Sequence, residues 1–218
     1  MKRLFIALVF SVGSVHAATI SFSSLVGSGV QADEWIVTNS SGVALSSGTV
    51  SVGYFNTISG TNGQLGAMSY ATLVADFHAL TVDDFVTYSS SINSPNGPIA
   101  GVTGGDVNIG AYSGSSRQLY VMISNTAALD GSATQYAFLN SNQTLTADGG
   151  TPDSNDFFFK DATVIAGTVG VGSFNGANVT GNNPQAATTL QLVAVPEPSA
   201  ALLGGLGALA LLRRRRVA

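Results

Sequence analysis

The stretch that most restricts the fold is the run Arg117–Ser124, which reads RQLYVMIS. Its consecutive apolar residues, Leu119 to Ile123, would point alternately to the two sides of an extended strand. Such a strand is stable only where other parts of the chain cover both of its faces. The run therefore predicts a central, doubly covered strand.

Other segments alternate apolar and small polar residues, as strands with one buried face do. Thr19–Leu25 and Thr49–Phe55 are clear examples. Further strands are expected at residues 34–38, 106–112, 135–139, 157–159, 163–171 and 188–194. Breaks rich in Gly, Asn and Ser separate these segments and indicate turns. We therefore predict a mainly β domain of the β-sandwich or jelly-roll type.

One segment departs from the period of two. Apolar residues between positions 69 and 80 recur at the spacing of one helix face. They are Tyr70, Leu73, Val74, Phe77 and Leu80. This spacing predicts one main α-helix over residues 69–80, packed on the sheet. The next four residues, Thr81–Asp84, have the pattern of a capping box and predict another short helical turn.

The first 18 residues have the pattern of a secretory signal peptide, with a helical apolar core. Met1–Arg3 is basic, Leu4–Val12 is apolar, and Val15–Ala17 carries the small residues of a cleavage site. We expect cleavage after Ala17 or Ala18. Everything that follows would then be exported.

The C-terminal segment 195–218 combines a proline-rich motif, an apolar run and a basic cluster. These parts are Pro196, Glu197 and Pro198, then Ala200–Leu212, then Arg213, Arg214, Arg215 and Arg216. A hydrophobic helix from Ser199 to Leu212 would rise about 21 Å at 1.5 Å per residue. A hydrocarbon core is about 30 Å thick, so we expect this helix to be held only transiently in the inner membrane. The arginines would form a cytoplasmic stop.

This three-part tail resembles the PEP-CTERM sorting signal of Gram-negative bacteria. The resemblance covers Pro196–Pro198, Ala200–Leu212 and Arg213–Arg216, about a tenth of the chain. It implies recognition by exosortase, a membrane protease or transpeptidase that removes the tail near Pro-Glu-Pro. It also implies a final place at the cell surface or in the biofilm matrix, in species that make exopolysaccharide. The family is defined by its tail, so the resemblance implies no activity for residues 19–194.

The exported part between the two ends is long enough for a single domain. It has no cysteine, which excludes disulfides, thiol nucleophiles and thiolate metal sites. It holds two basic residues, Arg117 and Lys160, against eleven acidic ones, a formal net charge of −9. Nucleic acids and anionic lipids need Lys and Arg on their partners, so neither is expected to bind this domain.

Candidates for chemistry are few. His78 is the only histidine after the signal peptide, and at the edge of the helical stripe it is expected to serve packing or surface rather than catalysis. The adjacent carboxylates Asp83 and Asp84 are explained by the predicted helical turn. The loop 148–156 is a weak candidate for calcium, with Asp148, Asp153 and Asp156 as ligands, and a solvated turn as the alternative. No cofactor is expected.

Three functions are compatible with the sequence. We expect a non-enzymatic surface or matrix protein, associated with biofilm or exopolysaccharide. The alternative is a carbohydrate-binding module with an aromatic site. Its candidate residues are Trp35, Tyr54, Tyr112 and Tyr120. A secreted polysaccharide hydrolase, the third possibility, needs two carboxyl groups about 5–10 Å apart.

Overall fold

A computed structural model of the chain describes residues 18–23, 35–80, 83–84, 86–88, 99–102, 104–110, 114–145, 155–173 and 186–196. Within these residues the protein is mainly β, as predicted. The expected signal helix and the expected C-terminal hydrophobic helix lie outside the described residues. In the part of the chain that is described, no helix has the length and apolar character needed to cross a membrane.

The main sheet has the strand order β12-β10-β9-β3-β4, with β15 added at β10 and β5 added at β3. Its strands are β3 (Thr49–Phe55), β4 (Phe77–Ala79), β5 (Asp83–Asp84), β9 (Arg117–Ser124), β10 (Gln135–Leu145), β12 (Thr163–Ala166) and β15 (Val193–Ala194). β9 lies between β10 and β3 and is antiparallel to both. Leu119, Val121 and Ile123 enter one hydrophobic cluster, and Tyr120 and Met122 enter a second. The prediction of a central strand covered on both faces is confirmed.

Smaller sheets cover one face of the main sheet within the described residues. Their orders are β11-β1-β8, β13-β14-β2 and β6-β7. Their strands are β1 (Ala18–Ser23), β2 (Trp35–Thr38), β6 (Val86–Tyr88), β7 (Ile99–Val102), β8 (Gly104–Gly110), β11 (Asn155–Phe158), β13 (Thr168–Ser173) and β14 (Ala186–Gln191). Phe22 of β1 and Val37 of β2 pack in the first cluster with Val52 and Val121 of the main sheet. Sandwiches and jelly rolls are built from antiparallel sheets. In this structure β1–β11 and β2–β14 are parallel pairs, so the sandwich or jelly-roll type stays a prediction.

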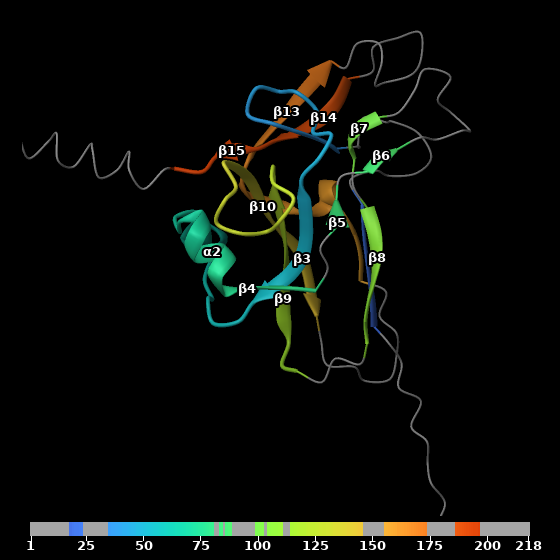
Figure 1. Cartoon of the computed structure of the whole chain (residues 1–218). Coiled ribbons are helices and arrows are strands. Elements are labelled where there is room, and N and C mark those ends of the chain that lie inside the picture. Colours follow the sequence, from blue (N-terminus) through green and yellow to red (C-terminus); the bar gives the residue numbers. More distant parts are fainter. Residues whose placement is uncertain are drawn as a thin grey trace, which may run out of the picture.

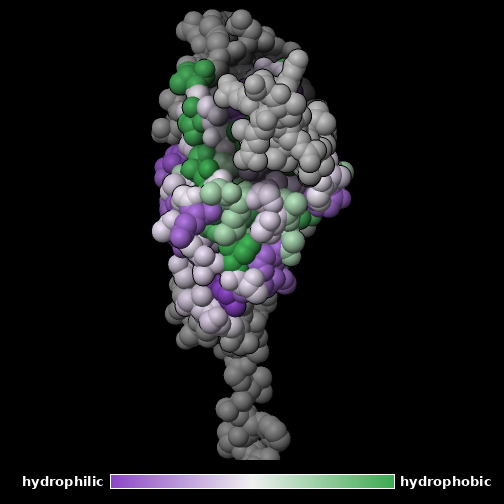
Figure 2. Space-filling view, turned by 90° about the vertical axis from the view of Figure 1, so that its left-hand side faces the viewer, coloured by the Kyte–Doolittle hydropathy of each residue, from purple (hydrophilic) through white to green (hydrophobic). Residues whose placement is uncertain are grey.

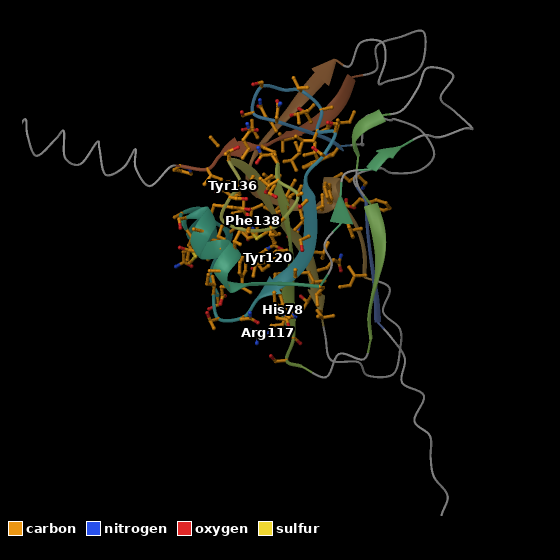
Figure 3. All side chains as sticks on the ribbon, in the orientation of Figure 1. His78, Arg117, Tyr120, Tyr136 and Phe138 are labelled. Atoms are coloured by element: carbon orange, nitrogen blue, oxygen red, sulfur yellow. The ribbon has the colours of Figure 1, made fainter. Side chains whose placement is uncertain are left out.

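Two short helices cover the other face, so that the main sheet lies between α2 and β8 (Figure 1). The helices are α1 (Asn62–Gly66) and α2 (Tyr70–Asp76). Leu65, Tyr70 and Leu73 are buried in the second cluster, against aromatic side chains of the sheet. Tyr120 and Phe138 belong to this layer (Figure 3), with ring centroids 5.4 Å apart. On the outer surface of this side, hydrophilic and hydrophobic residues are interspersed (Figure 2).

The predicted helix over residues 69–80 is present but shorter than expected. Ser69 is its N-cap, and the Ser69 side chain accepts a hydrogen bond from the Thr72 amide. The helix ends at Asp76, whose carboxylate accepts hydrogen bonds from the Thr57 and Ile58 amides at 2.9 and 2.7 Å. The next residues extend as β4 and pair with β3. Residues 77–79 are therefore strand, because backbone pairing with β3 replaces the last helical turn.

The prediction of a helical turn at residues 81–84 is wrong for its second half. Asp83 and Asp84 form β5 and pair with Val50 and Thr49 of β3. Thr81 and Val82 lie outside the described residues. A capping box exists elsewhere: the Thr61 amide donates to Gln64 Oε1 at 2.9 Å, and the Gln64 amide donates to Thr61 Oγ1 at 3.3 Å. This pair begins α1, which the periodicity did not predict.

The predicted strand 163–171 is divided between two sheets at Gly167. β12 pairs with β10 in the main sheet, and β13 pairs with β14 in a smaller sheet. Gly167 has φ +127°, a conformation that side-chain-bearing residues rarely adopt. A Cβ there would lie 3.1 Å from Leu190 Cδ1 and 3.3 Å from the Gln191 carbonyl oxygen. Glycine therefore permits the chain to cross between the sheets.

Candidate functional site

The sorting residues predicted from the sequence fall mostly beyond the described part of the chain. Pro196 is described and exposed, whereas Glu197, Pro198 and Arg213 to Arg216 lie outside. Of the predicted cleavage residues, Ala17 lies outside. Ala18 is the first residue of β1, and its backbone pairs with Gly110. Cleavage after Ala17 would thus leave β1 whole.

The calcium candidates are not brought together within the described residues. Asp148 and Asp153 lie outside them, and Asp156 is in β11, paired with Ser21 of β1. Among the described residues, no group of three or more histidine, aspartate or glutamate side chains could hold a metal ion. The calcium loop stays a prediction.

The aromatic candidates differ in exposure. Trp35 and Tyr120 are each 8% exposed and pack in the two hydrophobic clusters, so neither offers a ring face to a ligand. Tyr112 lies outside the described residues. Tyr54 is half-buried on β3, at the margin of the first cluster. Of the three of these residues that the structure describes, Tyr54 is therefore the least buried.

Tyr54 stands between the only histidine and one of the two basic residues of the exported part. His78 of β4 lies directly opposite Tyr54, with ring centroids 4.8 Å apart and planes tilted by 38°. The Arg117 guanidinium carbon lies 5.6 Å from the centre of the Tyr54 ring. We call Tyr54, His78 and Arg117 the Tyr54 cluster. His78 and Arg117 lie at the same end of the main sheet (Figure 3).

Backbone acceptors hold Arg117 in this position. Its Nη1 donates to the Asn56 carbonyl oxygen at 3.2 Å and to the Phe55 carbonyl oxygen at 3.5 Å. Within the described residues, the single ion pair joins Lys160 to Asp161, so no described carboxylate is paired with Arg117. His78 is exposed. The cluster combines an aromatic ring, an imidazole and a guanidinium, which can stack on an apolar face and donate hydrogen bonds.

The sequence did not predict the Tyr54 cluster because His78 was assigned to a helix. In β4, cross-strand pairing places the two side chains on one face of the sheet. The sequence pattern did not show that α2 ends at Asp76, and this end is what places His78 in a strand.

The described part of the fold reaches the first residue of the proline-rich motif. β15 pairs with β10 through Gln135↔Ala194 and Tyr136↔Val193. The Val195 amide donates to the Thr134 carbonyl oxygen at 2.8 Å. Pro196 has no amide hydrogen and cannot continue this ladder. We call residues Val193–Pro196, together with the segment of β10 beside them, the sorting junction.

Side-chain packing at the sorting junction is modest. Val193 and Val195 are half-buried against the second cluster, and Ala194 is exposed. Leu192, one residue earlier, is 1% exposed in the first cluster, and its amide donates to the Thr38 carbonyl oxygen at 2.9 Å. The chain is therefore held firmly at Leu192 and lightly after it.

A family model of the PEP-CTERM protein-sorting motif matches residues 194–216. This match confirms the resemblance of the C-terminal tail, and it overlaps the sorting junction at Ala194, Val195 and Pro196. No curated protein matches the chain. No solved structure matches it either. The motif implies an exported protein that is sorted by exosortase through the membrane to the surface of a Gram-negative cell.

Proposed function

We propose that this chain is a non-enzymatic protein of the cell surface or extracellular matrix, associated with biofilm or exopolysaccharide. The observation that carries the proposal is the sorting motif at residues 194–216, directly after a mainly β domain. The motif accounts for delivery and for one partner, exosortase. The β domain would then be the exported part of the protein, and it would act outside the cell through the residues on the surface of the domain.

Two carboxylates have pKa shifts opposite to the shift that a general acid needs. Burial acts to raise the pKa of Asp76, but hydrogen bonds from Ile58 and Thr57 outweigh it and hold the pKa below its usual value. Hydrogen bonds from the Ser132 side chain and amide lower the pKa of Asp130. A general acid working near neutral pH needs a raised carboxyl pKa. Both groups have the opposite shift and serve local structure.

The test follows the exported protein in its native host. Intact-mass measurement should find residues 1–17 or 1–18 removed and Arg213 to Arg216 absent. Deletion of the gene should change surface or biofilm behaviour, while the purified protein leaves polysaccharides, peptides and esters unchanged. Turnover of such a substrate that is lost on changing one carboxylate would contradict the proposal and favour a hydrolase.

Carbohydrate binding is the second candidate, and the Tyr54 cluster favours it. A half-buried tyrosine ring can pack against the apolar face of a sugar. Arg117 and His78 beside it can donate hydrogen bonds to hydroxyl or carboxylate groups of the same sugar. Sugars that carry a carboxylate should be preferred, because Arg117 has no carboxylate partner among the described residues.

A glycan array of the purified exported protein tests this second candidate. Binding to acidic glycans should be lost in Tyr54→Leu and retained in Tyr54→Phe, which keeps the ring. Arg117→Gln should weaken binding, whereas Lys160→Gln, which removes the other cation of the exported part, should not. Equal binding by Tyr54→Leu and the unmodified protein would exclude the cluster as the site.

A further inference from the structure

The last residue of β15, Ala194, belongs both to the folded domain and to the sorting motif. The motif match begins at Ala194, which is paired with Gln135 of β10. Among the described residues, the backbone hydrogen bond nearest the C-terminus is donated by Val195, immediately before Pro196. No linker separates the described fold from the proline-rich motif.

This arrangement leaves a short connection to the membrane. Only residues 196–198 separate Val195 from the expected start of the hydrophobic helix at Ser199. Three extended residues span about 10 Å. The radius of gyration of a compact domain of this length is about 16 Å. With β15 paired, the domain would therefore be held against the membrane surface, where an enzyme must reach the motif.

The backbone of β15 is also already engaged. An enzyme that binds a peptide as an extended strand needs the backbone N–H and C=O groups of that peptide. In the sorting junction, β10 occupies such groups through the β10–β15 ladder and the Val195–Thr134 hydrogen bond. Pairing with β10 and pairing with an enzyme are mutually exclusive for the same groups.

We propose that β15 and Val195 form a releasable clasp, which must leave β10 before exosortase can process the tail. The inference rests on the proposed sorting function. Release is limited to a short stretch, because Leu192 is buried and bonded to Thr38. Freeing residues 193–195 doubles the connection to six residues, about 20 Å, which exceeds the radius of gyration estimated for the domain.

The absence of cysteine from the chain permits a specific test. Val195 and Thr134 are hydrogen-bonded, so Gln135 and Ala194 form the non-hydrogen-bonded pair beside them, whose side chains approach more closely. The double variant Gln135→Cys with Ala194→Cys should form a disulfide after export. This bond would lock β15 on β10.

Tail removal is measured in cells by pulse labelling and intact mass. The cross-linked chain should be processed at least tenfold more slowly than the unmodified chain, and a reductant should restore processing. The single variants Gln135→Cys and Ala194→Cys are the controls for loss of the native side chains.

Two outcomes would count against the clasp or its basis. Processing of the cross-linked chain at the unmodified rate would overturn the clasp. A tail retained by the unmodified chain, in a host with active exosortase, would contradict the sorting function itself. The unmodified chain therefore separates failure of the sorting function from failure of the clasp.

Discussion

Gly53 of β3 and His78 of β4 are in backbone contact that admits no side chain at position 53. A Cβ built on Gly53 would lie 2.1 Å from the His78 carbonyl oxygen and 2.8 Å from the Phe77 ring. The carbonyl belongs to the β4 backbone and cannot rotate away as a side chain can. Gly53 therefore allows β4 to pair with β3 and places His78 beside Tyr54.

Gly53→Ala should detach β4 from β3. The overlap with a backbone atom should lower the free energy of unfolding by about 1–3 kcal/mol, measured by urea denaturation. The matched control is Gly63→Ala in α1, where a Cβ meets nothing within 4 Å. That change should be neutral or stabilise by up to about 1 kcal/mol. Equal stability of the two variants would contradict the close approach.

Tyr70→Phe should not destabilise the protein. The Tyr70 hydroxyl is buried without a hydrogen-bond partner among the described residues. The Ser124 side chain lies near it and acts to lower the pKa of Tyr70, but the two hydroxyl groups do not meet the geometry of a hydrogen bond. Removing an unsatisfied hydroxyl should leave the free energy of unfolding unchanged or raise it by up to about 1 kcal/mol. A loss above 1 kcal/mol in thermal and urea denaturation would reveal a partner for this hydroxyl.

Stability should fall in alkaline solution. Burial raises the pKa of Tyr70 to about 12, against 10.0 for the free side chain. Because the folded pKa is raised, the stabilisation is complete below pH 10 and is lost as pH rises from 10 toward 12. The loss is on the order of 2–3 kcal/mol for two pKa units. Burial also raises the pKa of Tyr120 and Tyr136.

Urea denaturation between pH 8 and pH 11.5 measures this loss. Tyr70→Phe should flatten the decline, because phenylalanine has no proton to lose. A decline of the same slope in Tyr70→Phe would assign the alkaline sensitivity to other groups.

Asp76→Asn should weaken the end of α2 and remove part of the acid sensitivity. Because hydrogen bonds lower the pKa of Asp76, its stabilisation is present above the unfolded value of 3.8 and is lost as pH falls through the lower folded value. Asparagine keeps one acceptor oxygen, so the cost at neutral pH should be about 1 kcal/mol. Asp161→Asn, on an exposed carboxylate, is the control. An unchanged acid profile in Asp76→Asn would argue against the capping role.

The sequence alone determined the sorting motif at the C-terminal end and the position of the central strand. Leu119 to Ile123 are apolar without interruption, and a strand can bury all of them only where both of its faces are covered. The start of α2 was also encoded locally, because the Ser69 side chain bonds within its own helix. In each case the decisive interaction is a property of consecutive residues.

Tertiary structure alone decided where α2 ends, that Asp83 and Asp84 are strand, and which residues meet at the Tyr54 cluster. Tyr54, His78 and Arg117 are distant in sequence, and the register of β3 with β4 brings the first two together. The same holds for the sorting junction, where Val195 bonds to Thr134. Side-chain periodicity reports which face of an element is apolar. It does not report which distant backbone completes the hydrogen bonds of that element, and this pairing fixed both sites.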